Sequence, residues 1–458
     1  MIPEATLEKI SRIVGAKSLV TRPEDLVEFA SDATSLAYMP DAVAFPKNSE
    51  EISEILQLAN REFFPVIPRG AGSGKSGGAL PVQGGLILAM DRLNRILGID
   101  HRNFIAKVEP GVITSHLQEK VEKRGLFYPP DPASLKISTI GGNVAECAGG
   151  LRAVKYGVTR DYVLGLKVVL PTGEIIQTGV DTSKGVVGYD LTRLIVGSEG
   201  TLAVVTAATL RLIPLPATKK TMLACFENTS LAVKTVTEIL LSKVVPTTME
   251  FMDRLSVETV RDKIHFSIPK NTGALLLLEV DGDEVLTRSE ALKVRETCMR
   301  CGAIHFEAAS NEEGAEMLWE TRRELSEALM ALKPNKVSED IVVPRTRLPD
   351  MVAFLEQLGE KYALPIPAFG HAGDGNIHVN IMFDKTNPEE VEKIDAVVKE
   401  LFEEVIGMGG TISGEHGIGI TKSPFIGMEL SGPTLALMSR LKKAFDPNGV
   451  LNPGKIFP

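Results

Sequence analysis

The chain has 458 residues, of which 44% are hydrophobic and 24% charged, values typical of soluble globular proteins. Asp and Glu number 59 against 50 Lys and Arg, a formal net charge of −9, which argues against nucleic acid or an anionic lipid surface as the main partner. The sequence has no apolar stretch near the ~20 residues of a membrane span and no apolar signal core at its start. We therefore expect a soluble cytoplasmic protein of two or three domains.

Residues 1–40 follow helical spacing, and short strands and helices alternate after them. Strands are predicted at 42–45, 65–68, 85–90, 104–108, 163–170 and 202–212, and helices at 49–61 and 114–123. Ser49, which is followed by acidic residues, is the predicted N-cap of the helix at 49–61. Pro214 and Pro216 then mark a change in composition.

Beyond residue 216 the pattern is that of an α+β domain. Strands are predicted at 221–225, 274–280, 341–343 and 377–383, and long charged helices at 231–241, 285–301, 312–330, 348–362 and 388–408. From residue 432 we expect a helix, followed by an extended tail rich in Pro and Gly.

Two glycine-rich segments are candidate ligand loops. In IPRGAGSGKSGGALP, Gly74-Lys75-Ser76 matches the end of a Walker A loop, but Arg69 stands where that loop needs its first glycine. The same glycines satisfy GxGxxG, yet the glycines and prolines that follow exclude the helix that a dinucleotide fingerprint requires. What remains is either an anion-binding nest suited to a pyrophosphate or a plain surface loop. The second segment, 138–157, holds five glycines, which allow close approach to a large flat ligand, although a tight helix crossing would explain its alanines.

Cys298 and Cys301 form a CxxC pair. A structural zinc site needs four ligands, and Cys147 and Cys225 stand apart in the sequence. The pair ends a predicted helix, whereas a reactive dithiol favours a helix N-terminus. We interpret both residues as small apolar side chains, and no cysteine cluster supports an iron–sulfur site within the chain.

Three segments carry a family resemblance. IPRGAGS, then PPDPASLKISTIGGNVAECAGG with VKYG, and then LIVGSEGTLAVVT resemble the FAD-binding domain of the vanillyl-alcohol-oxidase type. From about residue 40 to 458 the chain is similar to the glycolate oxidase flavin subunit and to bacterial D-lactate and D-2-hydroxyglutarate dehydrogenases. The resemblance implies an α+β fold with four parts. They are an N-terminal helical segment at 1–40, a two-subdomain FAD-binding domain at 41–215, a substrate-binding cap domain at 216–411 with an antiparallel sheet flanked by helices, and a segment at 412–458 that returns to the FAD domain.

The same resemblance implies which residues contact FAD. The first loop would hold the pyrophosphate, the second segment the flavin and its chain, Gly200 and Val204 the adenine side, and Asn452 would bring the tail back to the cofactor. The predicted set is Arg69, Gly70, Ala71, Gly72, Ser73, Gly74, Gly77, Pro132, Thr139, Gly142, Asn143, Gly149, Gly150, Gly157, Gly200, Val204 and Asn452. Some relatives attach FAD covalently through a histidine in the first loop. Since no histidine lies between 69 and 78, we predict non-covalent FAD.

Three of the seven histidines lie in FGHAGDGNIHVN and SGEHGIG. Asp374-Gly375 is a hairpin signal, and a turn centred there pairs His371 with His378, which places their Cβ atoms ~4.5–5.5 Å apart. The GEHG loop offers a third ligand from Glu415 or His416, which would point in opposite directions in an extended segment, so that one could bind a metal. Two histidines and a carboxylate are typical of a catalytic divalent site; the alternative is a stacked histidine pair beside an exposed glutamate. The resemblance makes His371, His378 and Glu415 metal ligands and His416 the base.

A 2-hydroxy acid needs a fixed cation for its carboxylate, and the bidentate fork of Arg suits this role. By its Trp-x-x-Arg pattern the resemblance selects Arg322 and leaves Arg323 at the surface; solvated arginines paired with nearby glutamates are the alternative. Lys336 is a weaker candidate, because the corresponding lysine of some relatives aligns with Ser338. Strand periodicity places both positions on one face.

Together these features predict FAD- and divalent-metal-dependent oxidation of a D-2-hydroxy acid, of the lactate, glycolate or 2-hydroxyglutarate kind, to the 2-oxo acid. Zn²⁺ is the expected metal, ahead of Fe²⁺ or Mn²⁺. Electrons would pass to a quinone or a protein acceptor: an electron-transferring flavoprotein, an iron–sulfur subunit or a cytochrome. Such a partner could bring the protein to a membrane, and a homodimer is compatible with the sequence. Two alternatives are an FAD-binding electron-transfer subunit without substrate chemistry and a non-redox metal-dependent hydrolase with structural glycine loops.

Overall fold

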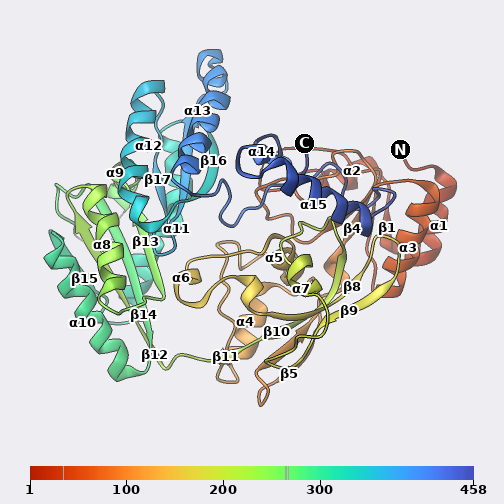
Figure 1. Ribbon diagram of the computed structural model, residues 1–458, viewed down its shortest axis with the longest axis horizontal. Helices are drawn as coiled ribbons and strands as arrows, with labels where there is room; N and C mark the ends of the chain where they lie inside the picture. Colours follow the sequence, from red (N-terminus) through yellow and green to blue (C-terminus); the bar gives the residue numbers. More distant parts are fainter. Residues whose placement is uncertain (35, 264–265, 267) are drawn as a thin grey trace. The chain divides into compact units, whose positions relative to one another are not determined.

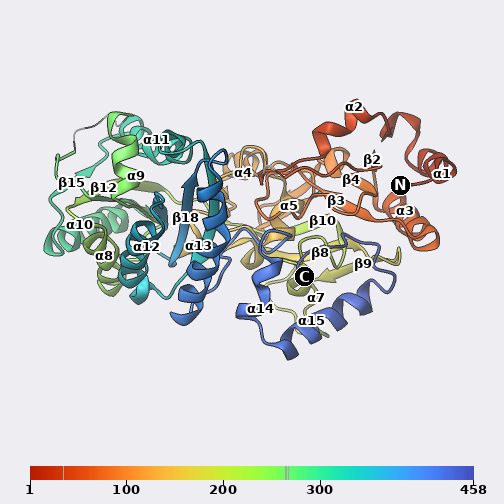
Figure 2. The same cartoon turned by 90° about the horizontal axis from the view of Figure 1, so that it is seen from above.

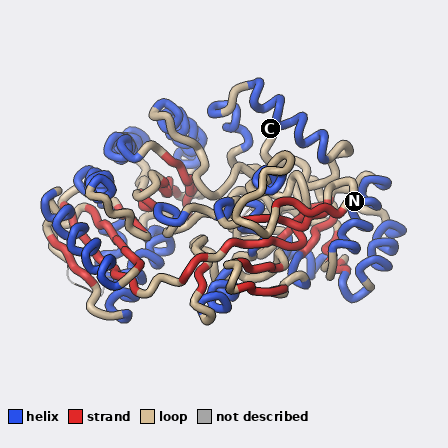
Figure 3. The backbone as a smooth tube through the Cα atoms, turned by 60° about the horizontal axis from the view of Figure 1, so that its bottom comes forward, coloured by secondary structure: helices blue, strands red, loops and turns tan. Residues whose placement is uncertain are grey.

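The computed structural model describes residues 1–34, 36–263, 266 and 268–458. Contacts divide the chain into two compact units. The first comprises Met1–Gly150, Gly157–Leu215 and Glu415–Pro458, and the second comprises Leu151–Tyr156 and Pro216–Gly414. Figure 3 distinguishes the helices from the strands of both units.

The first unit contains two larger sheets. One has the order β1-β2-β4-β3, in which β2, β4 and β3 are parallel. The strands are β1 (Leu19–Val20), β2 (Ala42–Ala44), β4 (Leu86–Ala89) and β3 (Val66–Arg69). One face packs on α1 (Glu4–Val14) and α3 (Ser49–Glu62) around a buried core that includes Ile10, Ile52 and Leu86. The other face packs against α2 (Pro23–Leu26) through Leu26.

The second sheet of this unit is antiparallel, with the order β5-β6-β10-β8-β9. Its strands are β5 (Ile96–Asp100), β6 (Ile105–Val108), β10 (Val204–Arg211), β8 (Val163–Val169) and β9 (Ile175–Gly179). The remaining α-helices and strands of the unit are α4 (Thr114–Glu122), α5 (Ile140–Glu146), α7 (Leu191–Ile195), β11 (Ile213–Pro214), α14 (Ile426–Glu429) and α15 (Gly432–Phe445), which Figure 1 labels, and β7 (Leu126–Phe127), which pairs with β11. The chain end returns to β3, because Val66 donates to the carbonyl of Val450 and accepts from the N–H of Asn452.

The second unit is built on one seven-stranded sheet with the order β15-β12-β14-β13-β17-β18-β16, in which every neighbouring pair is antiparallel. The strands are β15 (His305–Ala308), β12 (Thr218–Phe226), β14 (Ala274–Gly282), β13 (Thr248–Met252), β17 (Ala368–His371), β18 (Asn376–Phe383) and β16 (Asn335–Val342). Figure 2 shows helices on both sides of it. One face packs on α9 (Arg254–Val260) and α11 (Glu312–Ala328). The other helices are α8 (Thr229–Leu241), α10 (Glu284–Arg300), α12 (Leu348–Tyr362) and α13 (Pro388–Gly407), and the short α6 (Ala153–Tyr156) also belongs to this unit.

The predicted fold class is confirmed: one unit carries two larger sheets and the two-stranded sheet of β7 and β11, and the other an antiparallel sheet flanked by helices. The predicted cap residue of α3 is wrong, because the side chain of Asn48, not Ser49, accepts the N–H of Glu51. Strands β5, β9, β13 and β15 and the two-residue strands β1, β7 and β11 were not predicted, and β1 interrupts the segment 1–40 that was expected to be helical. Strand β16 begins six residues earlier than expected, at Asn335. The predicted domain boundaries remain predictions; the units join 1–40 to the first unit and 151–156 to the second. Among the described helices, none combines the length and apolar character that a bilayer crossing requires.

Candidate active site

The first glycine-rich segment runs as an irregular loop after β3. As expected, it does not continue into a helix. In the described structure, no backbone N–H from Gly70 to Ala79 donates a hydrogen bond to another protein atom. A run of peptide N–H groups without protein acceptors is the arrangement that binds phosphate oxygens. The residues of this loop therefore fit the pyrophosphate of a dinucleotide.

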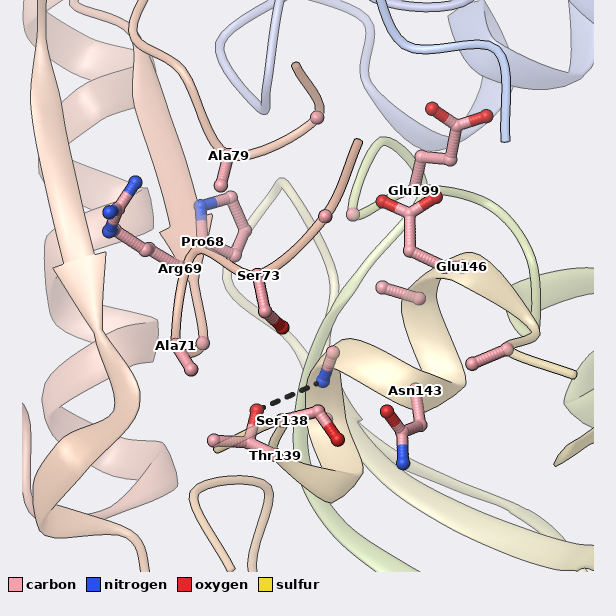
Figure 4. A pocket seen from close by; sticks show the side chains of 18 of the residues that line it. Pro68, Arg69, Ala71, Ser73, Ala79, Ser138, Thr139, Asn143, Glu146 and Glu199 are labelled. Atoms are coloured by element: carbon pink, nitrogen blue, oxygen red, sulfur yellow. Dashed lines mark hydrogen bonds between the residues drawn. The ribbon is translucent and has the colours of Figure 1, made fainter. Parts of the chain in front are cut away.

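The start of α5 forms the facing wall, as Figure 4 shows for Thr139 and Asn143. Thr139 caps this helix by accepting the N–H of Gly142 at 3.2 Å. A Cβ at Gly70 would lie only 2.4 Å from the Thr139 hydroxyl oxygen. The glycine at position 70 thus allows the loop to approach the helix start closely, and the two segments form one cavity.

Thirteen of the seventeen residues predicted to contact FAD line this cavity. They are Arg69, Gly70, Ala71, Gly72, Ser73, Gly74, Pro132, Thr139, Gly142, Asn143, Gly149, Gly200 and Val204. Gly77, Gly150, Gly157 and Asn452 are not part of the lining. Asn452 instead donates from its side-chain amide to the carbonyls of Gly78 and Glu199, at 2.9 and 2.8 Å. The tail thereby holds two parts of the cavity wall together.

Arg69 lies at the edge of the cavity, and its guanidinium is directed away from α5 in Figure 4. Its Nη2 donates to the carbonyl of Ser31 at 2.7 Å, and the group lies 5.9 Å from the ring centroid of Phe29. Burial lowers the pKa of this guanidinium. The structure therefore places the Arg69 side chain against the N-terminal segment, while its backbone begins the loop.

The sequence analysis did not identify Glu199, which also lines the cavity. Both of its carboxylate oxygens accept backbone N–H groups, from Ile418 at 2.8 Å and from Gly419 at 2.6 Å. Burial raises the pKa of the Glu199 carboxyl, and these two hydrogen bonds oppose that effect. Glu199 fixes the segment that follows Glu415 and His416, two residues that line the same cavity. The only sign in the sequence that Glu199 belongs to the site was its position directly before Gly200, a predicted FAD contact.

The hairpin that carries His371 and His378 forms, but the predicted register is wrong. Phe369, not His371, pairs with His378, and the register is shifted by two residues. The connection between the strands is a four-residue loop, 372–375, in which the N–H of Asp374 donates to His371 and that of Gly375 to Ala372. A shift of two keeps both imidazoles on one face of the sheet. Their ring centroids lie 5.1 Å apart, with the rings at 86°.

Glu415 joins this pair, and one ligand atom from each of the three side chains lies within 4.8 Å of the others. Glu415 follows Gly414, the last residue of the second unit, by a single peptide bond. The N–H of Gly414 donates to the backbone carbonyl and to the carboxylate of Asp340, both at 3.0 Å. Asp340 is the direct cross-strand neighbour of His378. Two imidazoles and a carboxylate at this spacing fit the ligand set of a divalent metal site.

Glu250 is a second residue that the sequence analysis missed. It is fully buried on β13, directly opposite His371 on β17. Its carboxylate contacts the Nδ1 of His371 at 2.5 Å and accepts from the Nε of Arg322 at 2.7 Å. Burial by itself raises the pKa of this carboxyl, but His371 and Arg322 outweigh burial and hold the pKa below its ordinary value. A glutamate within an apolar strand was the only sign in the sequence.

Arg322 and Lys336, the predicted substrate cations, differ in their surroundings. The Arg322 guanidinium lies 4.5 Å from the ring centroid of Phe369, on the face that carries the two histidines. Arg323 lies outward and pairs with Glu316. Lys336 donates to the hydroxyl and carbonyl oxygens of Ser326, at 2.7 and 2.9 Å. Ser326 lies one helical turn after Arg322, so α11 brings both cations to one helix face.

The four cysteines are all free. Cys298 is buried in the last turn of α10, and burial raises the pKa of its thiol to about 12. Cys225 lies in the core, where burial also raises its pKa to about 12. A reactive dithiol needs a thiol with a lowered pKa, and neither Cys225 nor Cys298 has one.

Comparison with known proteins identifies the class. A family model described as "FAD linked oxidases, C-terminal domain" matches residues 215–456, and one described as "FAD binding domain" matches residues 40–179. The chain belongs to the FAD-linked oxidase family and is an FAD-dependent oxidoreductase.

Curated relatives extend over nearly the whole chain. Glycolate oxidase subunit GlcD of Bacillus subtilis is 44% identical over 458 residues, which cover 100% of this chain and 97% of the relative. D-lactate dehydrogenase of Anaerostipes hadrus is 37% identical, over 91% of this chain and 89% of the relative. Among solved structures, p-cresol methylhydroxylase superposes with a TM-score of 0.81 at 18% identity, over 99% of this chain and 96% of that one. The vanillyl-alcohol-oxidase type of fold is thereby confirmed.

Proposed function

We propose that this protein is a metal-dependent flavoprotein dehydrogenase that oxidises a D-2-hydroxy acid to the 2-oxo acid. The observation that carries the proposal is the group formed by His371, His378 and Glu415, in which one ligand atom of each side chain lies within 4.8 Å of the others. The names of the relatives, a glycolate oxidase subunit and a D-lactate dehydrogenase, support the substrate class.

The chain would hold one divalent ion through the two imidazoles and the carboxylate. The mixed nitrogen and oxygen ligands favour Zn²⁺, with Fe²⁺ and Mn²⁺ as alternatives. A cation at this position supplies Lewis-acid chemistry, which lowers the pKa of an alcohol. His416, next to Glu415 and in the cavity lining, would take the hydroxyl proton as the general base.

The substrate carboxylate would be held by Arg322. Its guanidinium lies on the same sheet face as the histidines and is fixed by Glu250 and by the ring of Phe369. A guanidinium offers a planar pair of donors that matches a carboxylate. Lys336, which is linked to the same helix face through Ser326, would add positive charge near that end of the substrate.

FAD would lie in the cavity of the first unit, with its pyrophosphate on the N–H groups from Gly70 to Ala79 and its ring near Glu415 and His416. The chemistry that FAD supplies is acceptance of the hydrogen at C2 with two electrons. We propose that it is bound non-covalently, since among the lining residues the only side chain of the kinds that link to flavin, His, Cys and Tyr, is His416, the proposed base. Electrons would then leave to a quinone or a protein acceptor.

The experiment is anaerobic mixing of the purified yellow protein with the D- and L-forms of lactate and of 2-hydroxyglutarate, and with glycolate, which is achiral. We expect bleaching of the flavin absorbance by one or more D-acids or by glycolate, with formation of the matching 2-oxo acid. Acid precipitation of the same sample should leave the flavin in the supernatant. Flavin that stays oxidised with every acid would indicate an electron-transfer subunit, and a colourless protein would indicate a hydrolase; either result would refute the proposal.

A further inference from the structure

Glu250 connects two groups that the proposed function treats separately, a metal ligand and the carboxylate clamp. Each carboxylate oxygen of Glu250 contacts a different group. One contacts the Nδ1 of His371, and the other accepts a hydrogen bond from the Nε of Arg322. The side chain has no exposed surface, so solvent does not compete for either contact. One buried carboxylate therefore sets the positions of both groups.

We propose that Glu250 is a positioning residue, which orients His371 for the metal and Arg322 for the substrate carboxylate and fixes the spacing between the two. This inference rests on the proposed function, because it gives a role to the same metal group and the same arginine.

The fold explains why Glu250 can reach both groups. Glu250 on β13 and His371 on β17 are direct cross-strand partners, so their Cβ atoms lie on the same face, ~4.5–5.5 Å apart. The helix α11 packs on this face of the sheet, and its Arg322 side chain reaches Glu250 from the helix. A contact at Nδ1 holds one edge of the imidazole, so Nε2 would be the atom that binds a metal. Such a carboxylate partner fixes both the tautomer and the ring orientation of a ligating histidine.

The arginine is constrained in the same way. Its Nε is bound to Glu250 and its plane lies over the ring of Phe369, with 4.5 Å from the guanidinium carbon to the ring centroid. The two terminal nitrogens, Nη1 and Nη2, then face a defined direction, as bidentate binding of a carboxylate requires. A 2-hydroxy acid has its carboxylate and hydroxyl on adjacent carbons. The spacing set by Glu250 would therefore select acids whose two groups are adjacent.

The chain contains a matched control for this residue. Glu279 is also a buried glutamate, 6% exposed, on the neighbouring strand β14. Its carboxylate accepts hydrogen bonds from the hydroxyl of Thr221 at 2.8 Å and from the indole N–H of Trp319 at 3.3 Å, and it lies 3.7 Å from the ammonium of Lys219. None of these three residues belongs to the metal group. Glu279→Gln removes a buried negative charge from the same sheet and so controls for the general effect of such a loss.

The experiment measures, for Glu250→Gln, Glu279→Gln and the parent holoprotein, the affinity for Zn²⁺ by competition with a chelating dye, and the KM and kcat for the acid that bleaches the parent flavin. We expect Glu250→Gln to weaken Zn²⁺ binding by roughly 10–100-fold and to raise KM more than it lowers kcat. Glu279→Gln should stay near the parent in both quantities. A folded, yellow Glu250→Gln protein with the Zn²⁺ affinity and KM of the parent would overturn the inference.

Two further arms keep the result interpretable. Glu250→Asp keeps the charge but is one methylene shorter, so it cannot span both partners. If Glu250→Gln does not fold, Glu250→Asp should still lose Zn²⁺ affinity, substrate affinity or both by about tenfold, and unchanged values for both would overturn the inference. Failure of the parent protein to bind Zn²⁺ or to be bleached would instead refute the proposed function.

Discussion

Arg322 shows how a single side chain acquires a role from its surroundings. In the sequence it is one of two consecutive arginines on a charged helix, and periodicity alone does not separate it from Arg323. In the structure Arg322 is 13% exposed and bound to Glu250, whereas Arg323 is 52% exposed and paired with Glu316. The family resemblance selected the arginine that lies inward in the structure, while the buried partner, Glu250, became visible only with the strand pairing.

This difference gives a paired test at the residue scale. Arg322→Lys keeps the charge but loses the planar donor pair, and charge-assisted hydrogen bonds contribute about 1.5–3 kcal/mol. We expect KM for the acid substrate to rise by one to two orders of magnitude. Arg323→Lys, the control one position away, should leave KM unchanged in steady-state kinetics. Equal effects of the two substitutions would remove Arg322 from substrate binding.

At the scale of elements, the hairpin of β17 and β18 explains what sequence reasoning could and could not predict. The glycines and the Asp374-Gly375 pair correctly indicated a turn between two histidines. The register was two residues off, because the four-residue loop, 372–375, is centred one residue earlier than predicted, between Gly373 and Asp374. The histidines still converge, since side chains two apart on a strand share a face. The prediction of proximity therefore survived an error in the turn.

Gly375 gives a prediction for this element. It has a φ of +88°, and a Cβ there would lie 2.1 Å from the carbonyl oxygen of Val343. A left-handed conformation costs a non-glycine residue about 1–2 kcal/mol, and the contact adds to this cost. We expect Gly375→Ala to lower the Tm and to weaken metal binding, because the loop connects the two histidine strands.

Gly407 at the end of α13 is the matched control. A Cβ at this position meets no atom within 4 Å, and alanine is favoured over glycine in a helix by about 0.5–1 kcal/mol. Gly407→Ala should therefore leave the Tm equal or higher in the same thermal denaturation series. A Gly375→Ala protein as stable as Gly407→Ala would show that the loop tolerates another conformation.

At the scale of the whole molecule, the cavity collects segments that are far apart in the sequence. The loop after β3, the start of α5, the segment around Glu199 and the Glu415–His416 pair all line it. Strand periodicity predicted β3, whereas the helices α5 and α7 were not predicted, and periodicity contains no information about which loops meet. The family resemblance supplied that assignment. It did not reveal the contacts by which Asn452 and Glu199 hold the wall together, because these depend on the return of the chain end.

The central claim is that a divalent ion held by His371, His378 and Glu415 enables oxidation of the acid. The most direct measurement is the anaerobic rate of flavin reduction by the active D-acid, in protein that has been stripped of metal by a chelator and then titrated with Zn²⁺, Mn²⁺ or Fe²⁺. The account predicts that the stripped protein keeps its flavin but loses reduction, and that about one equivalent of a divalent ion restores it. Full activity of the metal-free protein would contradict the account. So would a His378→Ala variant that needs the same ion concentration as the parent protein to restore flavin reduction.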